Sequence, residues 1–183
     1  MANTAFVTGG TGFIGLNLVE LLVNQGWDVT ALHRPTSKQN ARQNAINIDG
    51  TRNVVEAAVS RGVGTLIHTS SISAWGRVSG TVTEATPMLG KDSWINYERS
   101  KHLGELEALK GMERGMKVVV MNPAAVAGPY DATTWGRLFF LLRDNALPAA
   151  PPGRITVGHV HDVVGAHLAA VTEGRDGERW RWP

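Results

Sequence analysis

The sequence of 183 residues contains no cysteine, which excludes disulfide bonds, thiolate metal sites and a cysteine nucleophile. Its 18 basic and 16 acidic residues leave a formal charge of only +2, with no basic stripe, so nucleic acid is not an expected partner. The apolar runs are too short to span a bilayer, and the first residues lack the basic and apolar regions of a signal peptide. These absences predict a soluble, cytoplasmic protein without a membrane partner.

Another absence is internal, in the stretch HRPTSKQNARQNAINIDGTRN at residues 33–53. Between Arg34 and a helix expected to begin near Gln43 there is no apolar run. The segments on either side resemble the opening and the later part of a nucleotide-binding α/β domain. With 43% hydrophobic residues, the chain is otherwise typical of a single globular domain.

Short apolar stretches alternate with segments of helical periodicity along the chain. Strands are expected at 4–8, 27–32, 65–70, 117–123 and near Thr156, and helices at 13–23, 47–62, 97–115, 135–145 and from Asp162. The run KVVVMNP at 117–123 is almost wholly apolar, as is typical of a strand buried on both faces. This alternation predicts an α/β fold with a parallel sheet and covering helices.

The first expected strand runs into TGGTGFIG, with Gly9, Gly12 and Gly15 at three-residue spacing. Gly9 would permit a tight turn, Gly12 would let the backbone approach a pyrophosphate, and Gly15 would allow close helix–strand packing. The helix start at Phe13 and Ile14 would offer free N–H groups to the phosphates. A tight turn that binds nothing is the alternative, but the position between a strand and an amphipathic helix favours dinucleotide binding.

The residues after the second expected strand bear on which dinucleotide is bound. NAD sites usually carry an acid there, whereas this chain has His33 and Arg34. A guanidinium could bind a 2′-phosphate bidentately, so we expect NADP, with NAD as the alternative. A solvated surface arginine is the other interpretation of Arg34.

The segment YERSK places Tyr97 and Lys101 four residues apart, on one face of an expected helix. An ammonium beside a phenol favours the ionised form and would suit Tyr97 to proton transfer near neutral pH. In HTSSISAWG, Ser71 could donate a hydrogen bond to a substrate oxygen. An exposed helix pair, and loop capping by Ser70 and Ser71, are the structural alternatives.

Six motifs together resemble the extended short-chain dehydrogenase/reductases of the NAD-dependent epimerase/dehydratase family. They are TGGTGFIG, NIDGTRNVVEAA, HTSS, YERSK, NPAAVAGP and HVHDV. The likeness is greatest to the dihydroflavonol-4-reductase-like and 3β-hydroxysteroid-dehydrogenase-like branch. The resemblance implies an active triad of Ser71, Tyr97 and Lys101. It also implies a cofactor site that includes Asn47, Thr69, Lys101 and the pair Asn122–Pro123.

The resemblance implies a Rossmann-type doubly wound parallel sheet with a small C-terminal substrate lobe. Residues 1–130 would form the NADP-binding domain and residues 131–183 part of a substrate-binding region. The implied activity is NADP(H)-dependent interconversion of a carbonyl and a secondary alcohol on a small, ring-containing apolar substrate. Trp75, Trp94 and Trp135 are either core residues or walls for such a ring. The family often dimerises through helices, so a homodimer is an expectation.

Two rival functions stay open. A nucleotide-sugar epimerase or dehydratase is one, although the dehydratases resembled here carry an Asp-Glu pair that TSSISAWG lacks. A protein that senses NADP without turnover is the other, although such proteins tend to lose the Tyr/Lys pair. His159, His161 and Asp162 could be metal ligands, but Asp162 near a helix start is better explained as a cap or first-turn acid, so no metal is expected.

In the family resembled, a further strand–helix–strand lies between the positions of Arg34 and Asn47. Such a unit needs about thirty residues or more, and here only the polar residues 35–46 separate the two positions. The chain also stops at GERWRWP, where relatives continue into the substrate lobe. Either the protein is minimal, or segments separated in the full-length chain are joined near 37–43. We favour the second explanation, because each remaining segment keeps the motif and the periodicity expected of its strand or helix.

Overall fold

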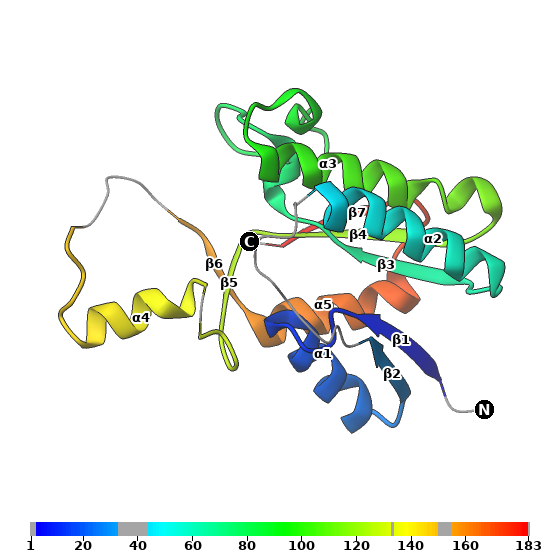
Figure 1. Ribbon diagram of the computed structural model, residues 1–183, viewed down its shortest axis with the longest axis horizontal. Coiled ribbons are helices and arrows are strands. Elements are labelled where there is room, and N and C mark those ends of the chain that lie inside the picture. Colours follow the sequence, from blue (N-terminus) through cyan, green and yellow to red (C-terminus); the bar gives the residue numbers. More distant parts are fainter. Residues whose placement is uncertain (1–2, 33–43, 133, 150–154, 183) are drawn as a thin grey trace. The chain divides into compact units, whose positions relative to one another are not determined.

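The computed structural model describes residues 3–32, 44–132, 134–149 and 155–182 (Figure 1). The chain divides into two compact units. Unit 1 comprises residues 1–35 and 125–168, together with Pro183, and unit 2 comprises residues 36–124 and 169–182. Arg34 and His33 lie outside the described residues. None of the described helices combines the length and apolar composition needed to cross a bilayer.

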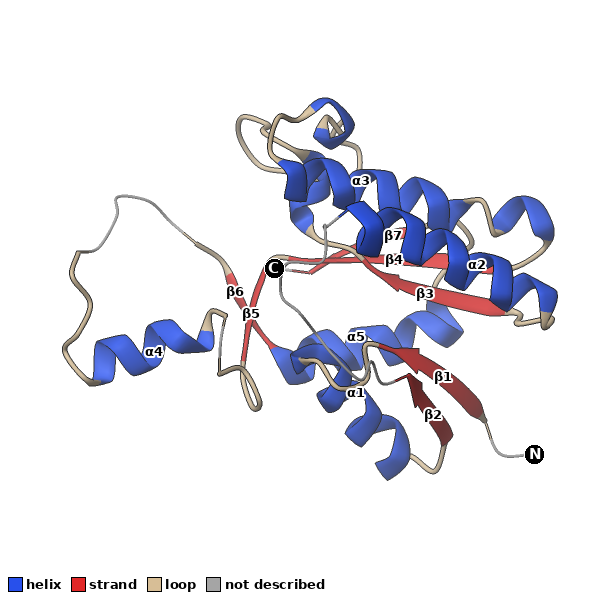
Figure 2. Ribbon diagram, viewed as in Figure 1, coloured by secondary structure: helices blue, strands red, loops and turns tan. Residues whose placement is uncertain are grey.

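Unit 1 contains two pairs of parallel strands, each joined through a helix (Figure 2). Its elements are β1 (Thr4–Thr8), α1 (Phe13–Asn24), β2 (Asp28–Leu32), β5 (Ala125–Ala127), α4 (Gly136–Arg143), β6 (Val157–His159) and most of α5 (Val160–Glu173). In the first pair Thr4 is opposite Asp28 and Thr8 is opposite Leu32. In the second pair Ala125 is opposite Val157. Each pair is therefore a β-α-β unit of the kind that builds parallel sheets.

Unit 2 contains a parallel sheet in the order β3-β4-β7. Its strands are β3 (Thr65–Thr69), β4 (Lys117–Pro123) and β7 (Arg179–Trp182), and its long helices are α2 (Gly50–Ser60) and α3 (Asn96–Leu109). Short helical turns η1 (Ala45–Asp49), η2 (Ile72–Trp75), η3 (Gly90–Asp92) and η4 (Met112–Arg114) connect them. α3 packs against α2, η1, η2 and η3, so this helix is the element on which the unit is assembled.

The core of unit 2 forms around β4. Residues 118–123 of this strand are all buried, as the apolar run predicts for a strand covered on both faces. Val118 and Val120 pack with Val55 of α2, Ala108 of α3 and Met116. Because α2 and α3 both contact this cluster, the helix faces are fixed by β4.

The predicted α/β fold with parallel strands is confirmed, although the described strands form three parallel sheets and not one continuous sheet. The helix expected over 97–115 ends earlier, at Leu109, and Gly115 then adopts a left-handed φ of 82°. The strands β5 and β7 were not expected. β5 spans only three residues, and β7 alternates arginine with tryptophan. The domain boundary at residue 130 stays a prediction.

Candidate active site

Tyr97 and Lys101 lie one helical turn apart on α3, in unit 2. The Tyr97 side chain is 39% exposed, whereas Lys101 is half-buried. Lys101 Nζ donates a hydrogen bond to the backbone oxygen of Thr69 at 3.3 Å and lies 5.9 Å from the centroid of the Tyr97 ring. The ammonium is therefore held at the carboxyl end of β3, close to the ring of Tyr97.

The surroundings of Lys101 act on its charge in opposite directions. Burial lowers the pKa of Lys101, and the negative charge of Glu105, one turn further along α3, opposes that effect. Burial, with a smaller contribution from Lys101, also lowers the pKa of His68 on β3 to about 3. His68 is therefore neutral near neutral pH and adds no second positive charge beside Lys101.

Ser70 and Ser71 follow β3 directly, and both are buried. Ser71 Oγ accepts a hydrogen bond from the backbone N–H of Ser73 at 3.2 Å and caps η2. Ser70 Oγ has no hydrogen-bond partner in the part of the chain that the structure describes. The capping alternative for Ser71 is thus observed, but it uses only a lone pair and leaves the hydroxyl proton able to donate to a ligand.

A buried polar network connects the strand ends to α3. Asn122 Nδ2 donates to the Ser71 backbone oxygen at 3.2 Å and to Glu105 Oε1 at 2.5 Å. Glu105 Oε2 accepts from Arg179 Nε of β7 at 3.0 Å. The sequence did not lead us to Glu105 or Arg179. Glu105 could have been found, because it repeats the four-residue spacing of Tyr97 and Lys101.

Asn47 and Pro123 are the other family-implied positions in unit 2. Asn47 Nδ2 donates to Ser100 Oγ at 3.0 Å, and a Cβ at Gly104 would overlap the Asn47 backbone oxygen. η1 is thereby packed tightly on α3, and Pro123 is buried at the end of β4. The part of either residue in cofactor binding stays a prediction.

The glycine turn belongs to unit 1. Gly9 has a left-handed φ of 71°, as a tight strand-to-helix turn requires. A Cβ at Gly15 would overlap the Gly9 backbone oxygen and lie 2.9 Å from Gly10 Cα, so only glycine fits there. Gly12 is the N-cap residue of α1 and has no side chain to bond the first helical N–H groups, which include those of Phe13 and Ile14. These groups could bind phosphate oxygens.

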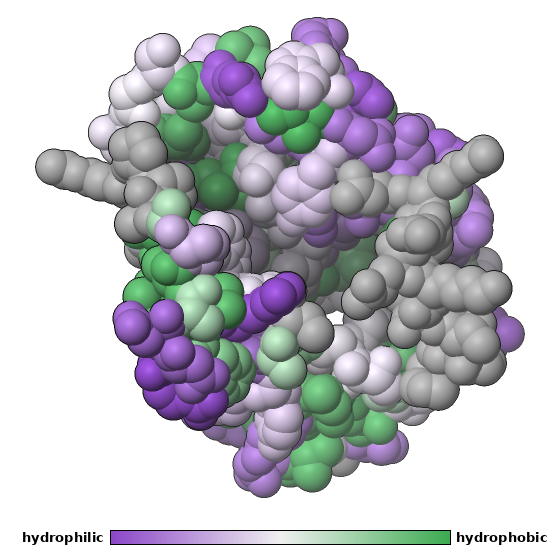
Figure 3. All heavy atoms as spheres, turned by 60° about the vertical axis from the view of Figure 1, so that its left-hand side comes forward, coloured by the Kyte–Doolittle hydropathy of each residue, from purple (hydrophilic) through white to green (hydrophobic). Residues whose placement is uncertain are grey.

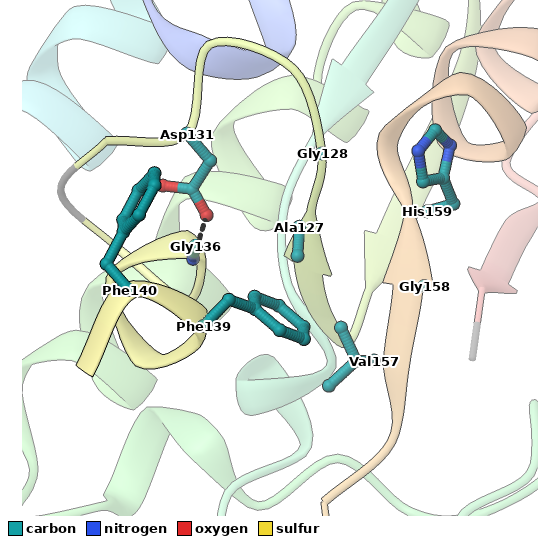
Figure 4. Close-up of a pocket in the computed structure, with 9 residues that line it drawn as sticks. All are labelled: Ala127, Gly128, Asp131, Gly136, Phe139, Phe140, Val157, Gly158 and His159. Atoms are coloured by element: carbon teal, nitrogen blue, oxygen red, sulfur yellow. Dashed lines mark hydrogen bonds between the residues drawn. The ribbon is translucent and has the colours of Figure 1, made fainter. Parts of the chain in front are cut away.

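A hollow of about 450 Å³ lies in unit 1 between α4 and the strands β5 and β6 (Figure 4). Phe139 points from α4 toward β5 and β6, and Phe140, Ala127 and Val157 add further apolar lining. Asp131 Oδ2 accepts from the Gly136 backbone N–H at 2.5 Å and fixes the start of α4. The hollow falls within the size range of small-molecule sites, about 300–1,000 Å³.

The three tryptophans singled out from the sequence have different surroundings. Trp75 is 1% exposed and its Nε1 donates to the Thr86 backbone oxygen at 3.0 Å, so it is a core residue and the wall interpretation is wrong for it. Trp94 is 77% exposed, with the Arg77 guanidinium 5.2 Å from its ring centroid. Trp135 is partly exposed at the N-cap of α4.

His159 and His161 pack edge to face, with ring centroids 4.7 Å apart, at the start of α5. Asp162 lies in the first turn of that helix, as the helix-start interpretation has it. Among the residues described, no group of three or more His, Asp or Glu side chains could hold a metal ion.

The model of the NAD dependent epimerase/dehydratase family matches this chain over residues 5–46 and 36–181. The chain belongs to this family. The two matches overlap at 36–46 and do not form one continuous match, so the pattern of the family is interrupted there. The interruption falls where the sequence predicted a missing strand–helix–strand.

A putative dihydroflavonol 4-reductase from Synechocystis sp. is 28% identical over 222 aligned positions, which take in 96% of this chain and 65% of that protein. Since 96% of 183 residues is about 176, about 46 of the 222 positions have no residue of this chain. The chain thus spans about two thirds of that relative. A crystal structure of gox2253 is 26% identical with a TM-score of 0.86, and the match covers 99% of this chain and 69% of that one.

Two more distant structures show the same fold. RMD from Pseudomonas aeruginosa, complexed with NADPH, is 21% identical with a TM-score of 0.80, covering 98% of this chain and 77% of that chain. The dTDP-glucose 4,6-dehydratase of Bacillus anthracis, in complex with NAD, is 20% identical with a TM-score of 0.82, covering 98% and 75%. These likenesses establish the Rossmann-type fold of the chain.

Proposed function

We propose that this chain carries the catalytic and cofactor-binding residues of an NADP(H)-dependent oxidoreductase that interconverts a carbonyl and a secondary alcohol. The observation that carries the proposal is the arrangement on α3, where the phenol of Tyr97 and the half-buried Lys101 share one helix face. The ammonium is bonded to Thr69, two residues before Ser71. This arrangement provides a proton donor, a cation beside it and a hydroxyl group at neighbouring positions of one unit.

Each residue of the triad has a separate task. Tyr97 Oη gives its proton to the carbonyl oxygen during reduction and takes it back during oxidation. Lys101 stabilises the phenolate, and Ser71 donates a hydrogen bond that orients the substrate oxygen. A bound nicotinamide cofactor would supply or accept the hydride at the same substrate carbon.

The glycine turn fits a dinucleotide by its shape. Gly15 lets the first turn of α1 approach the backbone of Gly9 and Gly10, and Gly12 leaves the helix start without a side chain. The first N–H groups of α1 would hold the pyrophosphate. Arg34 would bind the 2′-phosphate and so favour NADPH over NADH. Known structures of this fold with NADPH and with NAD support a nicotinamide cofactor in general.

The hollow of unit 1 supports an apolar, ring-containing substrate. Its lining contains two phenylalanines and aliphatic carbon atoms. The carboxylate of Asp131, which also lines it, already accepts a hydrogen bond from the N–H of Gly136. Aromatic rings bury large apolar area and stack on flat groups. The Synechocystis relative is a reductase by its name, which supports a reductase activity over an epimerase activity.

Replacing Tyr97 with phenylalanine tests the reaction. Loss of the phenolic proton should lower the rate of NADPH oxidation with an activated ketone by a factor of about 10²–10⁴, because no general acid remains. Binding of NADPH, measured by fluorescence titration, should survive. Tyr130→Phe is the matched control, because Tyr130 is the only other tyrosine of the chain. Near-normal turnover by the Tyr97→Phe variant would remove Tyr97 from the mechanism.

A further inference from the structure

Glu105 is a fully buried carboxylate to which the proposed mechanism assigns no task. Its exposed fraction is 0%, which is uncommon for an acidic residue unless it is paired. It lies four residues beyond Lys101, as Lys101 lies four residues beyond Tyr97. The three side chains therefore share one face of α3 at successive turns.

Two donors from other elements hold the Glu105 carboxylate in place. Asn122 of β4 donates to Oε1 at 2.5 Å and Arg179 of β7 donates to Oε2 at 3.0 Å. Because Asn122 Nδ2 also donates to the Ser71 backbone oxygen, only its nitrogen can face these two acceptors. One amide thus ties the position of Glu105 to the strand end that carries Ser71.

The charge of Glu105 matters most to Lys101. An ammonium removed from water tends to lose its proton unless an anion is near. Within the described part of the chain, the titratable groups that act on Lys101 or lie beside it are Tyr97 and Glu105 on α3 and His68 on β3, which is neutral near neutral pH. η2 contains no titratable residue, and Arg179 faces Glu105. Among these groups, Glu105 is the one that can supply the balancing negative charge.

We propose that Glu105 is a positioning residue: fixed by Asn122 and Arg179, its carboxylate keeps the Lys101 ammonium charged and so sets the pH range over which Tyr97 exchanges its proton. The inference rests on the proposed oxidoreductase function for its catalytic meaning. The Glu105 carboxylate touches neither substrate nor cofactor in this scheme and acts only through Lys101.

The chain offers a direct readout, because it has only two tyrosines, Tyr97 and Tyr130. In a Tyr130→Phe background, the ultraviolet absorbance of tyrosinate against pH follows the ionisation of Tyr97 alone, without substrate or turnover. With Glu105→Gln, Lys101 should lose its proton at a lower pH, and the phenolate then lacks its ammonium. The midpoint of Tyr97 ionisation should move up by on the order of one pH unit.

Glu107→Gln in the same background is the matched control. Glu107 is also on α3 and is also ion-paired, but its partners are Arg52 at 3.1 Å and Lys110 at 2.8 Å. Its loss should leave the Tyr97 midpoint unchanged. An unmoved midpoint in Glu105→Gln would make Glu105 a purely structural ion-pair partner. A downward shift would mean that the carboxylate acts on the phenol directly, and either result overturns the proposal.

Glu105→Asp carries the test if Glu105→Gln does not fold. Aspartate is one methylene shorter, so its carboxylate lies further from Lys101 and the midpoint of Tyr97 ionisation should rise by a smaller amount. An unchanged midpoint would count against the proposal. The rate of alcohol oxidation against pH, measured on the same variants, should show the same upward shift. If the absorbance shift occurs but wild-type protein turns over no alcohol with NADP⁺, the oxidoreductase function fails while the link from Glu105 to Lys101 and Tyr97 stands.

Discussion

The two units of the chain differ in how completely they bury their strands. In unit 2 every residue of β4 from Val118 to Met121 is at most 1% exposed. In unit 1 the Phe6 side chain of β1 is 63% exposed, and Leu32 of β2, Phe139 of α4 and Val157 of β6 are exposed as well. Hydrophobic residues reach the surface in the space-filling view (Figure 3). The proposed catalytic residues therefore lie in the unit that contains the almost wholly buried β4, whereas the glycine turn follows β1, of which only Val7 is buried.

This difference agrees with the interruption of the family pattern at residues 36–46. A parallel strand with helices on both faces is normally buried on both sides. Of β1, only Val7 is buried, and its one strand partner among the described residues is β2. A strand–helix–strand of the kind expected between Arg34 and Asn47 would follow β2 in the chain and extend the sheet there. The strands β1 and β2, which directly precede the interruption, are therefore strands with few buried residues.

The largest effect should come from removing a core side chain of unit 2. Met121→Ala should lower the free energy of unfolding by about 2–5 kcal/mol, because a buried side chain is lost and a cavity remains. Phe6→Ala, which removes a larger but exposed side chain, should change it by no more than about 0.5 kcal/mol. Urea unfolding of both variants in one buffer measures the pair. If the two variants lost equal free energy of unfolding, the difference in burial between β4 and β1 would be contradicted. Such a result would show that apolar material covers β1 in the folded protein.

The sequence predicted the parts of the site that depend on local spacing. Gly9, Gly12 and Gly15 adopt the turn that their pattern indicates, and Tyr97 and Lys101 share a face because a helix repeats every four residues or so. What depends on contacts distant in sequence was not predictable.

The Glu105–Arg179 ion pair illustrates that limit. Its two residues are 74 positions apart. Arg179 comes from β7, whose four residues RWRW form a strand although no apolar run in the sequence predicts one there. Trp75 illustrates the same limit, since its burial depends on a bond to Thr86 in a loop that periodicity does not describe. Pairings of this kind require the tertiary structure, because neither local propensity nor hydrophobic period encodes them.

A smaller effect is expected for cofactor choice, which concerns unit 1 alone. Arg34 should meet the 2′-phosphate through charge-assisted hydrogen bonds worth about 1.5–3 kcal/mol. At about 1.4 kcal/mol per factor of ten, NADPH should bind tenfold to a hundredfold more tightly than NADH. Arg34→Ala should weaken NADPH and leave NADH nearly unchanged. His33→Asp should shift the balance further, because a carboxylate repels the phosphate and can accept from the ribose hydroxyls.

The measurement for Arg34 is the ratio of the two dissociation constants at one salt concentration, because exposed charges are screened by salt. Arg61→Ala, which removes an exposed arginine from unit 2, is the matched control and should leave the ratio unchanged. Equal affinity of the wild-type protein for NADH and NADPH would make Arg34 a surface arginine and would favour the epimerase alternative.

An effect of equal or smaller size is expected for Gly15→Ala, which tests whether the turn of unit 1 is rigid although the strand before it is exposed. The added Cβ would overlap the Gly9 backbone oxygen and lie 2.8 Å from the Gly9 carbonyl carbon, so backbone must move. Overpacking of this kind costs about 1–3 kcal/mol. Because the first turn of α1 moves with it, the affinity for NADPH should fall by roughly tenfold to a hundredfold at the upper end of that range.

Gly64→Ala adds the same methyl group in unit 2 where no atom lies within 4 Å, and it should change neither the stability nor the affinity for NADPH. Calorimetric titration and thermal unfolding of both variants provide the measurement. If Gly15→Ala binds NADPH as tightly as the wild-type protein does, the backbone of the turn adjusts without loss of affinity. The prediction of a rigid phosphate-binding turn in unit 1 would then be wrong.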